Sequence, residues 1–321
     1  MPDYIFKTYI DSGREYYEYT DVTDREQTIK KDFPFPESLM DLLYMDTQEL
    51  EAITKKMGKA LLAFYQSGAK DDLQVVAAGL DEIASRHVYF ELLRLDWTER
   101  LKVAERVTPK EYLRLLPHKK ISHIYSNIDT MQRQIISLIA HALDMDGEKK
   151  SVSEKMVAYY NAEGNDTLYT FQFQPQPVNF EVIDRRIFAE VLYPKDIYDL
   201  IDHHIRECVK REVRMRVCKN CLRYFAVTGK ASTEYCDRVC DSKGRTCREI
   251  GAINTWTQRK QGDEVFKEYR REYKKRFARI NAGKLTKSAF YAWSEEARKK
   301  KEDCDSGAIS PEEFSRWLKE S

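Results

Sequence analysis

The seven cysteines are the residues of this sequence with the most distinctive chemistry, and none occurs before residue 208. Six fall within forty residues and one stands apart: Cys208, Cys218, Cys221, Cys236, Cys240, Cys247 and Cys304. An odd, clustered set in a chain whose start lacks a signal-peptide pattern is typical of reduced thiols and metal ligands. The pattern therefore favours metal binding over a disulfide framework.

Cys218 and Cys221 form a CxxC knuckle, a turn that lets two thiolates point at one metal ion about 2.3 Å away. Residues 222–227 are predicted to form a strand after the knuckle, and a turn follows it. Residues 234–236 are then predicted to return as a second strand that carries Cys236, the third ligand. A knuckle followed by a hairpin is typical of treble-clef and zinc-ribbon-like fingers.

Four ligands close a structural zinc site, and the fourth is either Cys240 or Cys247, which begins a helical run. We therefore predict zinc as the cofactor. The alternatives are buried reduced thiols, a redox CxxC site, which lacks a surrounding βαβ pattern, and an iron–sulfur cluster, which lacks a recognised spacing. Cys208 on a helix face and Cys304 in a polar loop are expected to take no part.

The region around the cysteines resembles an uncharacterised bacterial family of unknown function whose members carry such a block near the C-terminus, followed by basic helices. The resemblance covers about residues 190–320, and it rests on Leu192-Tyr-Pro-Lys-Asp-Ile-Tyr-Asp-Leu-Ile201, Val217-Cys-Lys-Asn-Cys221, Tyr224-Phe225, Glu234-Tyr-Cys-Asp237 and Gly244-Arg-Thr-Cys-Arg-Glu-Ile-Gly251. Because its most specific run contains Cys247, the resemblance favours Cys247 over Cys240 as fourth ligand. It implies a fold but no activity.

Charge divides the chain at the same place as the cysteines. The formal net charge is +1, but residues 206–321 hold 29 Lys and Arg against 18 Asp and Glu, a net +11, so residues 1–205 carry −10. Such asymmetry points to an anionic partner for the basic third. The alternative is a basic tail that packs on its own acidic body.

The most basic segment is a predicted helix from residue 263 to 279, whose aromatic residues at 266, 269, 273 and 277 share one face. Packing on neighbouring helices, with a solvated charged face, explains these aromatic residues better than nucleic-acid binding does, but it does not explain the one-sided basic excess. As DNA- or RNA-phosphate contacts we predict the Lys and Arg residues of the finger and this helix: Arg216, Lys219, Arg223, Lys230, Arg245, Arg248, Lys267, Arg270, Arg271, Lys274, Lys275, Arg276 and Arg279.

Two functions remain open on this basis. The first is a zinc-finger protein that binds nucleic acid through its basic C-terminal third. The second is an interaction or scaffold protein, in which zinc only stabilises a small module and the basic face meets another protein.

Nothing in the sequence nominates a catalytic group. The six histidines show no metal-ligand spacing, and their only cluster, Asp202-His203-His204, places adjacent residues on different sides of a helix. Phosphate-binding, dinucleotide-binding, nucleophile-elbow and kinase motifs are all absent. The sequence therefore favours a binding role, and an enzyme in the N-terminal body, the third function left open, would require a well-formed pocket.

The elements that position these residues are mainly helical, and we predict a mainly α, α+β fold. Residues 1–36 are expected to be an extended arm or edge strand because of Pro34 and Pro36. Helices are expected at 46–64, 73–95 with a break near Gly79, 109–116, 128–143, 151–163 and 196–209, with two more beginning near 286 and 310. Strands are expected at 167–174, 178–183 and 187–193.

These elements suggest four parts. We predict an acidic helical body over 1–163, a small β element with a connector helix over 164–205, a four-cysteine module over 206–262 and a basic helical segment over 263–321. No stretch approaches the ~18 consecutive apolar residues of a membrane-spanning helix. We therefore expect a cytoplasmic protein without a membrane partner.

Overall fold

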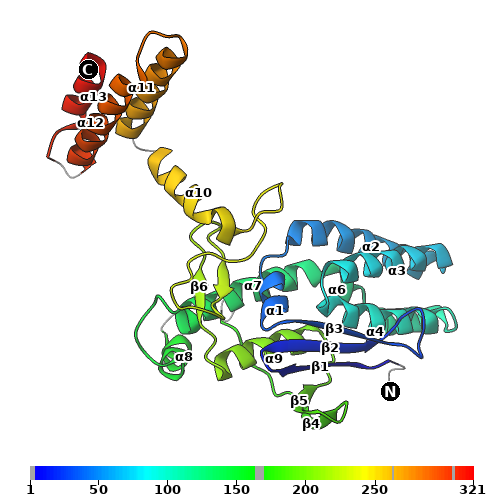
Figure 1. Cartoon of the computed structure of the whole chain (residues 1–321). Helices are drawn as coiled ribbons and strands as arrows, with labels where there is room; N and C mark the ends of the chain where they lie inside the picture. The colour runs from blue at the N-terminus through cyan, green and yellow to red at the C-terminus, as the bar shows by residue number, and fades with distance from the viewer. Residues whose placement is uncertain (1–3, 163–169, 262–263, 306–307) are drawn as a thin grey trace. The chain divides into compact units, whose positions relative to one another are not determined.

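The computed structural model describes residues 4–162, 170–261, 264–305 and 308–321 (Figure 1). The chain divides into two compact units. The body unit comprises residues 1–217 and 223–233, and the finger unit comprises residues 218–222 and 234–321. Helices predominate and the strands pair antiparallel, so the predicted α+β class is confirmed.

A five-stranded antiparallel sheet lies in the body unit, in the order β3-β2-β1-β5-β4. Its strands are β1 (Phe6–Asp11), β2 (Arg14–Thr20), β3 (Thr28–Pro34), β4 (Val178–Ile183) and β5 (Ile187–Leu192). The expectation of an arm or edge strand over residues 1–36 is wrong for β1 and β2, which lie inside the sheet; only β3 is at an edge. Ser12 and Gly13, with φ of 49° and 76°, turn the chain between them, and Tyr17 and Tyr19 are fully buried.

The sheet joins segments that are far apart in the sequence. β1 pairs with β2 on one side and with β5 on the other, so that Tyr9 lies opposite Tyr16 and also opposite Val191. The strands predicted at 178–183 and 187–193 are therefore part of one sheet with the N-terminus. The strand predicted at 167–174 does not form over residues 170–174, and its residues 167–169 lie outside the described part of the chain.

Helices make up the rest of the body unit: α1 (Glu37–Leu42), α2 (Thr47–Ser67), α3 (Lys70–Arg86), α4 (Tyr89–Ala104), α5 (Pro109–Leu115), α6 (His118–Ser122), α7 (Ile124–Leu138) with a π-helical turn η1 (Ile139–Leu143), α8 (Val152–Asn161) and α9 (Ile197–Lys210). α2, α3 and α4 lie side by side (Figure 1). The helix predicted over 73–95 breaks between α3 and α4, not at Gly79. A Cβ on Gly79 would come within 2.4 Å of Met57, so this glycine allows α2 and α3 to approach closely.

A buried polar network ties α9 to the sheet and accounts for the only histidine cluster. His204 is fully buried; its Nδ1 lies 2.8 Å from the Leu200 carbonyl oxygen, which can only accept, so Nδ1 carries a proton. Its Nε2 lies 2.8 Å from the Tyr17 hydroxyl and 3.2 Å from Oε2 of the equally buried Glu15. His204 is thus a core residue with partners.

The two strands beside the CxxC knuckle belong to the body unit. β6 (Met215–Val217) pairs antiparallel with β7 (Tyr224–Ala226), with Arg216 opposite Phe225. The predicted strand at 222–227 is confirmed in its centre, but the predicted strand at 234–236 is wrong. β7 takes its partner from the residues before the knuckle, because the knuckle itself turns the chain back on β6.

The finger unit contains α10 (Cys247–Gln261), α11 (Glu264–Asn281), α12 (Lys287–Asp305) and α13 (Pro311–Glu320). Phe290, Trp293 and Ala297 of α12 pack with Phe314 and Leu318 of α13. The helices predicted near 286 and 310 are therefore confirmed; a capping box of Ser310 and Glu313 begins the last one. Among the described helices, none combines the length and apolar character required to cross a bilayer.

Candidate metal centre

The knuckle is a closed turn between β6 and β7. The backbone N–H of Leu222 donates to the carbonyl oxygen of Cys218 over 2.9 Å, which brings Cys218 and Cys221 to the same side. Leu222 completes the turn with φ of 58°, in the left-handed region that a leucine rarely adopts.

The segment that carries Cys236 is attached to the knuckle by its backbone. The N–H of Lys219 donates to the carbonyl oxygen of Glu234 over 3.1 Å, and the N–H of Cys236 points at Sγ of Cys218 over 3.4 Å. Cys236 therefore reaches the knuckle without a β-ladder.

Cys247 is presented by the first turn of α10. Thr246 and Glu249 cap this helix reciprocally: the Thr246 N–H donates to Glu249 over 2.7 Å, and the Glu249 N–H donates to the Thr246 hydroxyl over 3.3 Å. One turn later, a Cβ on Gly251 would lie 2.3 Å from the Tyr235 ring, so only glycine lets the helix lie this close. Three roles thus lie within the run of residues 244–251: Thr246 and Glu249 cap the helix, Cys247 supplies a sulfur, and Gly251 allows the close contact with Tyr235.

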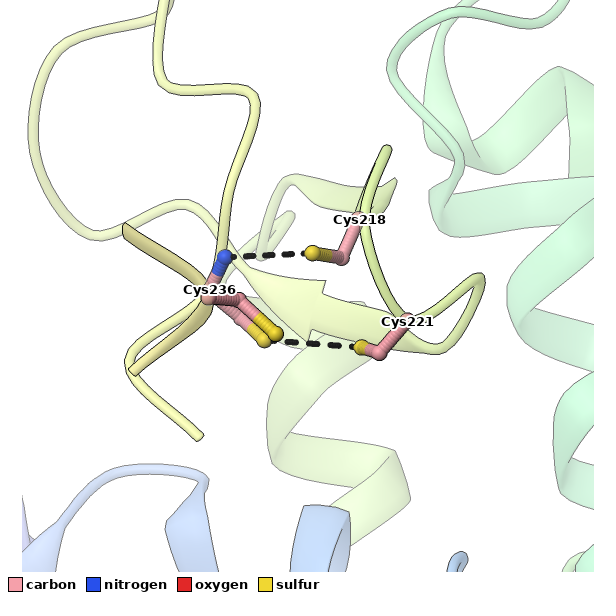
Figure 2. Close-up of side chains that lie close together, drawn as sticks. Cys218, Cys221 and Cys236 are labelled. Carbon is pink, nitrogen blue, oxygen red and sulfur yellow. Dashed lines mark hydrogen bonds between the residues drawn. The ribbon is translucent and has the colours of Figure 1, made fainter. Parts of the chain in front are cut away.

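Four sulfur atoms converge as a result. Those of Cys218, Cys221, Cys236 and Cys247 lie within 4.8 Å of one another and could hold a metal ion. The Sγ atoms of Cys221 and Cys236 are 3.7 Å apart, and a dashed line joins them in Figure 2. Tetrahedral Zn–S bonds of about 2.3 Å place neighbouring sulfurs about 3.8 Å apart, whereas a disulfide requires about 2 Å. The donor set fits a metal better than a disulfide.

The other cysteines lie outside this group. Cys240 is exposed and its Sγ donates to the carbonyl oxygen of Arg245 over 3.4 Å. Cys208 is fully buried in the apolar core of the body unit, and Cys304 packs beside the core of α12 and α13. Of the two residues proposed for the fourth position, the structure therefore brings Cys247, and not Cys240, to the other three.

The thiols differ in how readily each one ionises. Burial raises the pKa of Cys218, but the backbone N–H groups of Cys221, Cys236 and Asn220 oppose it and bring that pKa down to about 7. Burial, reinforced by negative charge on Cys218 and Cys221, raises the pKa of Cys236 to about 11. Burial also raises the pKa of Cys247. Four thiolates this close repel one another, so full ionisation calls for a cation among them.

Hydrogen-bond donors around the sulfurs form a second layer that the sequence did not reveal. The Asn220 carboxamide donates from Nδ2 to Sγ of Cys247 over 3.2 Å, and Arg238 lies 3.8 Å from Sγ of Cys236 through Nη1. Such donors orient metal ligands and stabilise their negative charge. The sequence signal that could have identified Asn220 as such a donor is its place between the two cysteines of the CxxC motif, where a polar side chain lies close to the sulfurs.

Most of the basic residues predicted near the finger have partners within the protein. Arg216 forms a two-pronged ion pair with Asp146, both contacts being 2.6 Å, and donates to the carbonyl oxygens of Ala231 and Thr233. Ion pairs also join Lys219 to Glu234, Arg245 to Asp241 and Arg248 to Asp237. Arg223 stacks over the Tyr44 ring at 5.1 Å, and Lys230 is exposed.

The basic residues of α11 divide between two faces. Tyr269 and Tyr273 face the core of α12 and α13, and Arg276 lies 4.6 Å over the Trp293 ring; burial lowers the pKa of this guanidinium. The packing expected of the aromatic face is therefore seen at these positions, while the side chain at 266 lies outside the described ones. The remaining predicted contacts on this helix are exposed: Lys267, Arg270, Arg271, Lys274, Lys275 and Arg279.

One protein family matches the segment that holds the cysteines and these helices. Residues 168–319 match the model of the DUF6076 family. DUF6076 is described as a family of unknown function, which confirms the resemblance to such a family. The matched segment extends from before β4 to α13, so it includes strands of the body unit as well as the finger unit. No curated protein and no solved structure matched the chain.

Proposed function

We propose that this protein binds one structural zinc ion through Cys218, Cys221, Cys236 and Cys247, and that helix α11 binds the phosphate backbone of nucleic acid. The observation that carries the proposal is the convergence of the four sulfur atoms within 4.8 Å.

The donor set favours zinc in a structural role. Four sulfur donors suit zinc or iron and exclude the oxygen-preferring Mg²⁺ and Ca²⁺. Cys218, Cys236 and Cys247 are buried, and four thiolates complete a tetrahedral shell with no position left for a reacting water. Zinc in such a site stabilises the fold and does not act on a substrate.

Metal analysis of the purified full-length chain tests the proposed zinc site. We expect about one zinc per chain, loss of that zinc in Cys236→Ser, and full retention in Cys208→Ser. Replacement by Co²⁺ should give the visible absorption of a tetrahedral tetrathiolate. Iron at equal stoichiometry, or a metal-free and folded protein, would overturn the zinc assignment.

The proposed binding of nucleic acid rests on a stripe of four exposed basic residues on α11. Lys267, Arg270, Arg271 and Lys274 follow one another at i, i+3, i+4 and i+7, which places them on one helix face. This basic stripe lies opposite the face of Tyr269 and Tyr273, which is packed on α12 and α13. A row of cations on a helix presents the charge pattern that phosphate backbones attract.

Ion pairs separate Arg216 from the other basic residues of the finger. The side chain of Arg216 is only 15% exposed and is held by Asp146, so it is left out of the proposal. Lys219, Arg245 and Arg248 form more exposed pairs, as does Arg271 of the stripe with Glu268 at 3.4 Å. Such pairs contribute about 0–1 kcal/mol, so phosphate can compete with them. The stripe is preferred because its four exposed cations share one helix face.

The proposed binding of nucleic acid is tested by measuring the affinity for mixed-sequence DNA and RNA at increasing salt concentration. If the stripe contacts phosphates, replacing its four residues with glutamine should reduce the slope of log K against log salt by about 3–4. The matched control carries four glutamines at exposed lysines of the body unit, Lys56, Lys59, Lys119 and Lys149, and should keep the slope. Salt-independent binding, or equal loss in both variants, would refute the nucleic-acid role and favour a protein partner.

A further inference from the structure

A cavity of about 270 Å³ in the body unit has walls of two different kinds. Leu92 of α4 and Ile124, Ile128 and Met131 of α7 supply apolar side chains. Lys120 of α6 and Lys195, just before α9, lie at its rim; both are exposed, so the cavity reaches solvent. Every one of these residues belongs to the body unit, so the cavity is independent of the metal centre and of the basic stripe.

The polar groups of the cavity are unevenly satisfied. Two carboxylates line it, but each has a partner: Asp96 accepts from Arg100 Nε over 2.8 Å, and Asp196 accepts from the backbone N–H of Asp199 as the cap of α9. Arg100 also donates to the Leu115 carbonyl oxygen over 3.1 Å. Across the described residues, by contrast, neither Lys120 nor Lys195 forms an ion pair through its ammonium group.

The charges of the lining residues favour an anion. The lining holds three cationic side chains, Arg100, Lys120 and Lys195, and two carboxylates, Asp96 and Asp196. Because Arg100 pairs with Asp96, the two lysines are balanced only by Asp196. The indole N–H of Trp97 has no acceptor among the described residues, but it is buried too deeply to open into the cavity.

We infer that this cavity is a binding site for a small organic acid, a carboxylate carried on an apolar ring or chain. The oxyanion would accept from Lys120 and Lys195, while the apolar part would contact Leu92, Ile128 and Met131. The site takes an anion and not a cation because its lining holds three cationic side chains against two carboxylates. The volume exceeds that of a cavity of about 150 Å³ that holds benzene, so a bicyclic ring fits.

Calorimetric titration of the full-length chain with 2-naphthoate tests this inference. We expect saturable one-site binding, with naphthalene-2-methanol, the neutral analogue, binding at least tenfold more weakly. The double variant Lys120→Gln/Lys195→Gln should lose at least tenfold in naphthoate affinity. A matched double variant at exposed lysines that do not line the cavity, Lys119→Gln/Lys149→Gln, should bind as the natural chain does.

Lys120 and Lys195 are exposed, so their replacement by glutamine should leave the fold intact. No saturable binding, equal binding of the neutral analogue, or unchanged affinity in Lys120→Gln/Lys195→Gln would each overturn the inference.

Discussion

Asn220, inside the CxxC knuckle, donates a hydrogen bond from its carboxamide to Sγ of Cys247, the first residue of α10, over 3.2 Å. The carbonyl oxygen of the same carboxamide accepts from Nδ2 of Asn254 over 3.2 Å. Asn254 lies about two turns after Cys247 in α10. Asn220 thus attaches the knuckle to the helix that supplies the fourth sulfur, and its orientation is set by both contacts.

Removing the donor of Asn220 should weaken metal binding. Asn220→Ala leaves the sulfur of Cys247 without its hydrogen bond, and loss of such a partner commonly costs 10–100-fold in metal affinity. Competition against a chelator of known zinc affinity measures the change. Asn179→Ala, at an exposed asparagine of β4, is the control and should have no effect. Unchanged affinity in Asn220→Ala would mean that the contact plays no part in holding the metal.

Cys240 and Cys247 should respond oppositely to replacement by serine. Cys247→Ser removes one of the converging sulfurs and should abolish stoichiometric zinc, whereas Cys240→Ser should retain about one zinc per chain because this thiol is exposed and outside the group. Metal content after dialysis against a mild chelator distinguishes the two variants. Zinc loss in Cys240→Ser would show that this cysteine supplies a ligand after all.

Arg216 should matter for stability and not for nucleic-acid binding. Its guanidinium holds Asp146 and two backbone carbonyl groups, so Arg216→Gln should lower the free energy of unfolding by roughly 1–3 kcal/mol. Urea denaturation provides that value, and the salt slope for nucleic acid should stay the same. Arg214→Gln, at an exposed arginine two residues earlier, should change neither quantity. A lower slope in Arg216→Gln would place this residue in the interface.

His87 should make the protein less stable in mild acid. Its Nε2 donates to the Ser38 carbonyl oxygen over 2.8 Å and its Nδ1 accepts from the Tyr89 N–H over 3.1 Å, an arrangement that only the neutral ring allows. Burial, its largest cause, lowers the pKa of His87 from 6.5 to about 4. Between those pH values the unfolded chain binds a proton that the folded chain does not, so stability falls as pH falls, by about 1.4 kcal/mol per pH unit.

His87→Gln keeps a donor for Ser38 but cannot titrate. The stability of this variant, from urea denaturation between pH 6.5 and 4, should fall less steeply than that of the natural chain. Burial likewise lowers the pKa of His203 to about 3, so part of the acid sensitivity should persist in His87→Gln. Parallel profiles for the two proteins would contradict the neutral-ring assignment.

The helices and the cysteine site were largely predictable because their signals are local. Ser310 and Glu313 form a capping box three residues apart, and the spacing of Phe290, Trp293 and Ala297 marks one helix face within two turns. The sheet was less predictable. The partner of β1 on one side is β5, about 180 residues away, and nothing in the alternation of either strand specifies that distant pairing.

Taken alone, the sequence determined which residues can bind a soft metal and where the charge changes sign, because thiol chemistry and formal charge belong to each residue wherever it lies. Only the tertiary structure decided between Cys240 and Cys247, since that choice depends on how Gly251 lets α10 approach Tyr235. It also separated the basic residues whose side chains are largely buried, such as Arg216 beside Asp146, from the exposed stripe on α11. An ion pair between residues 70 positions apart depends on the folded path of the chain, which brings their charges within reach of each other.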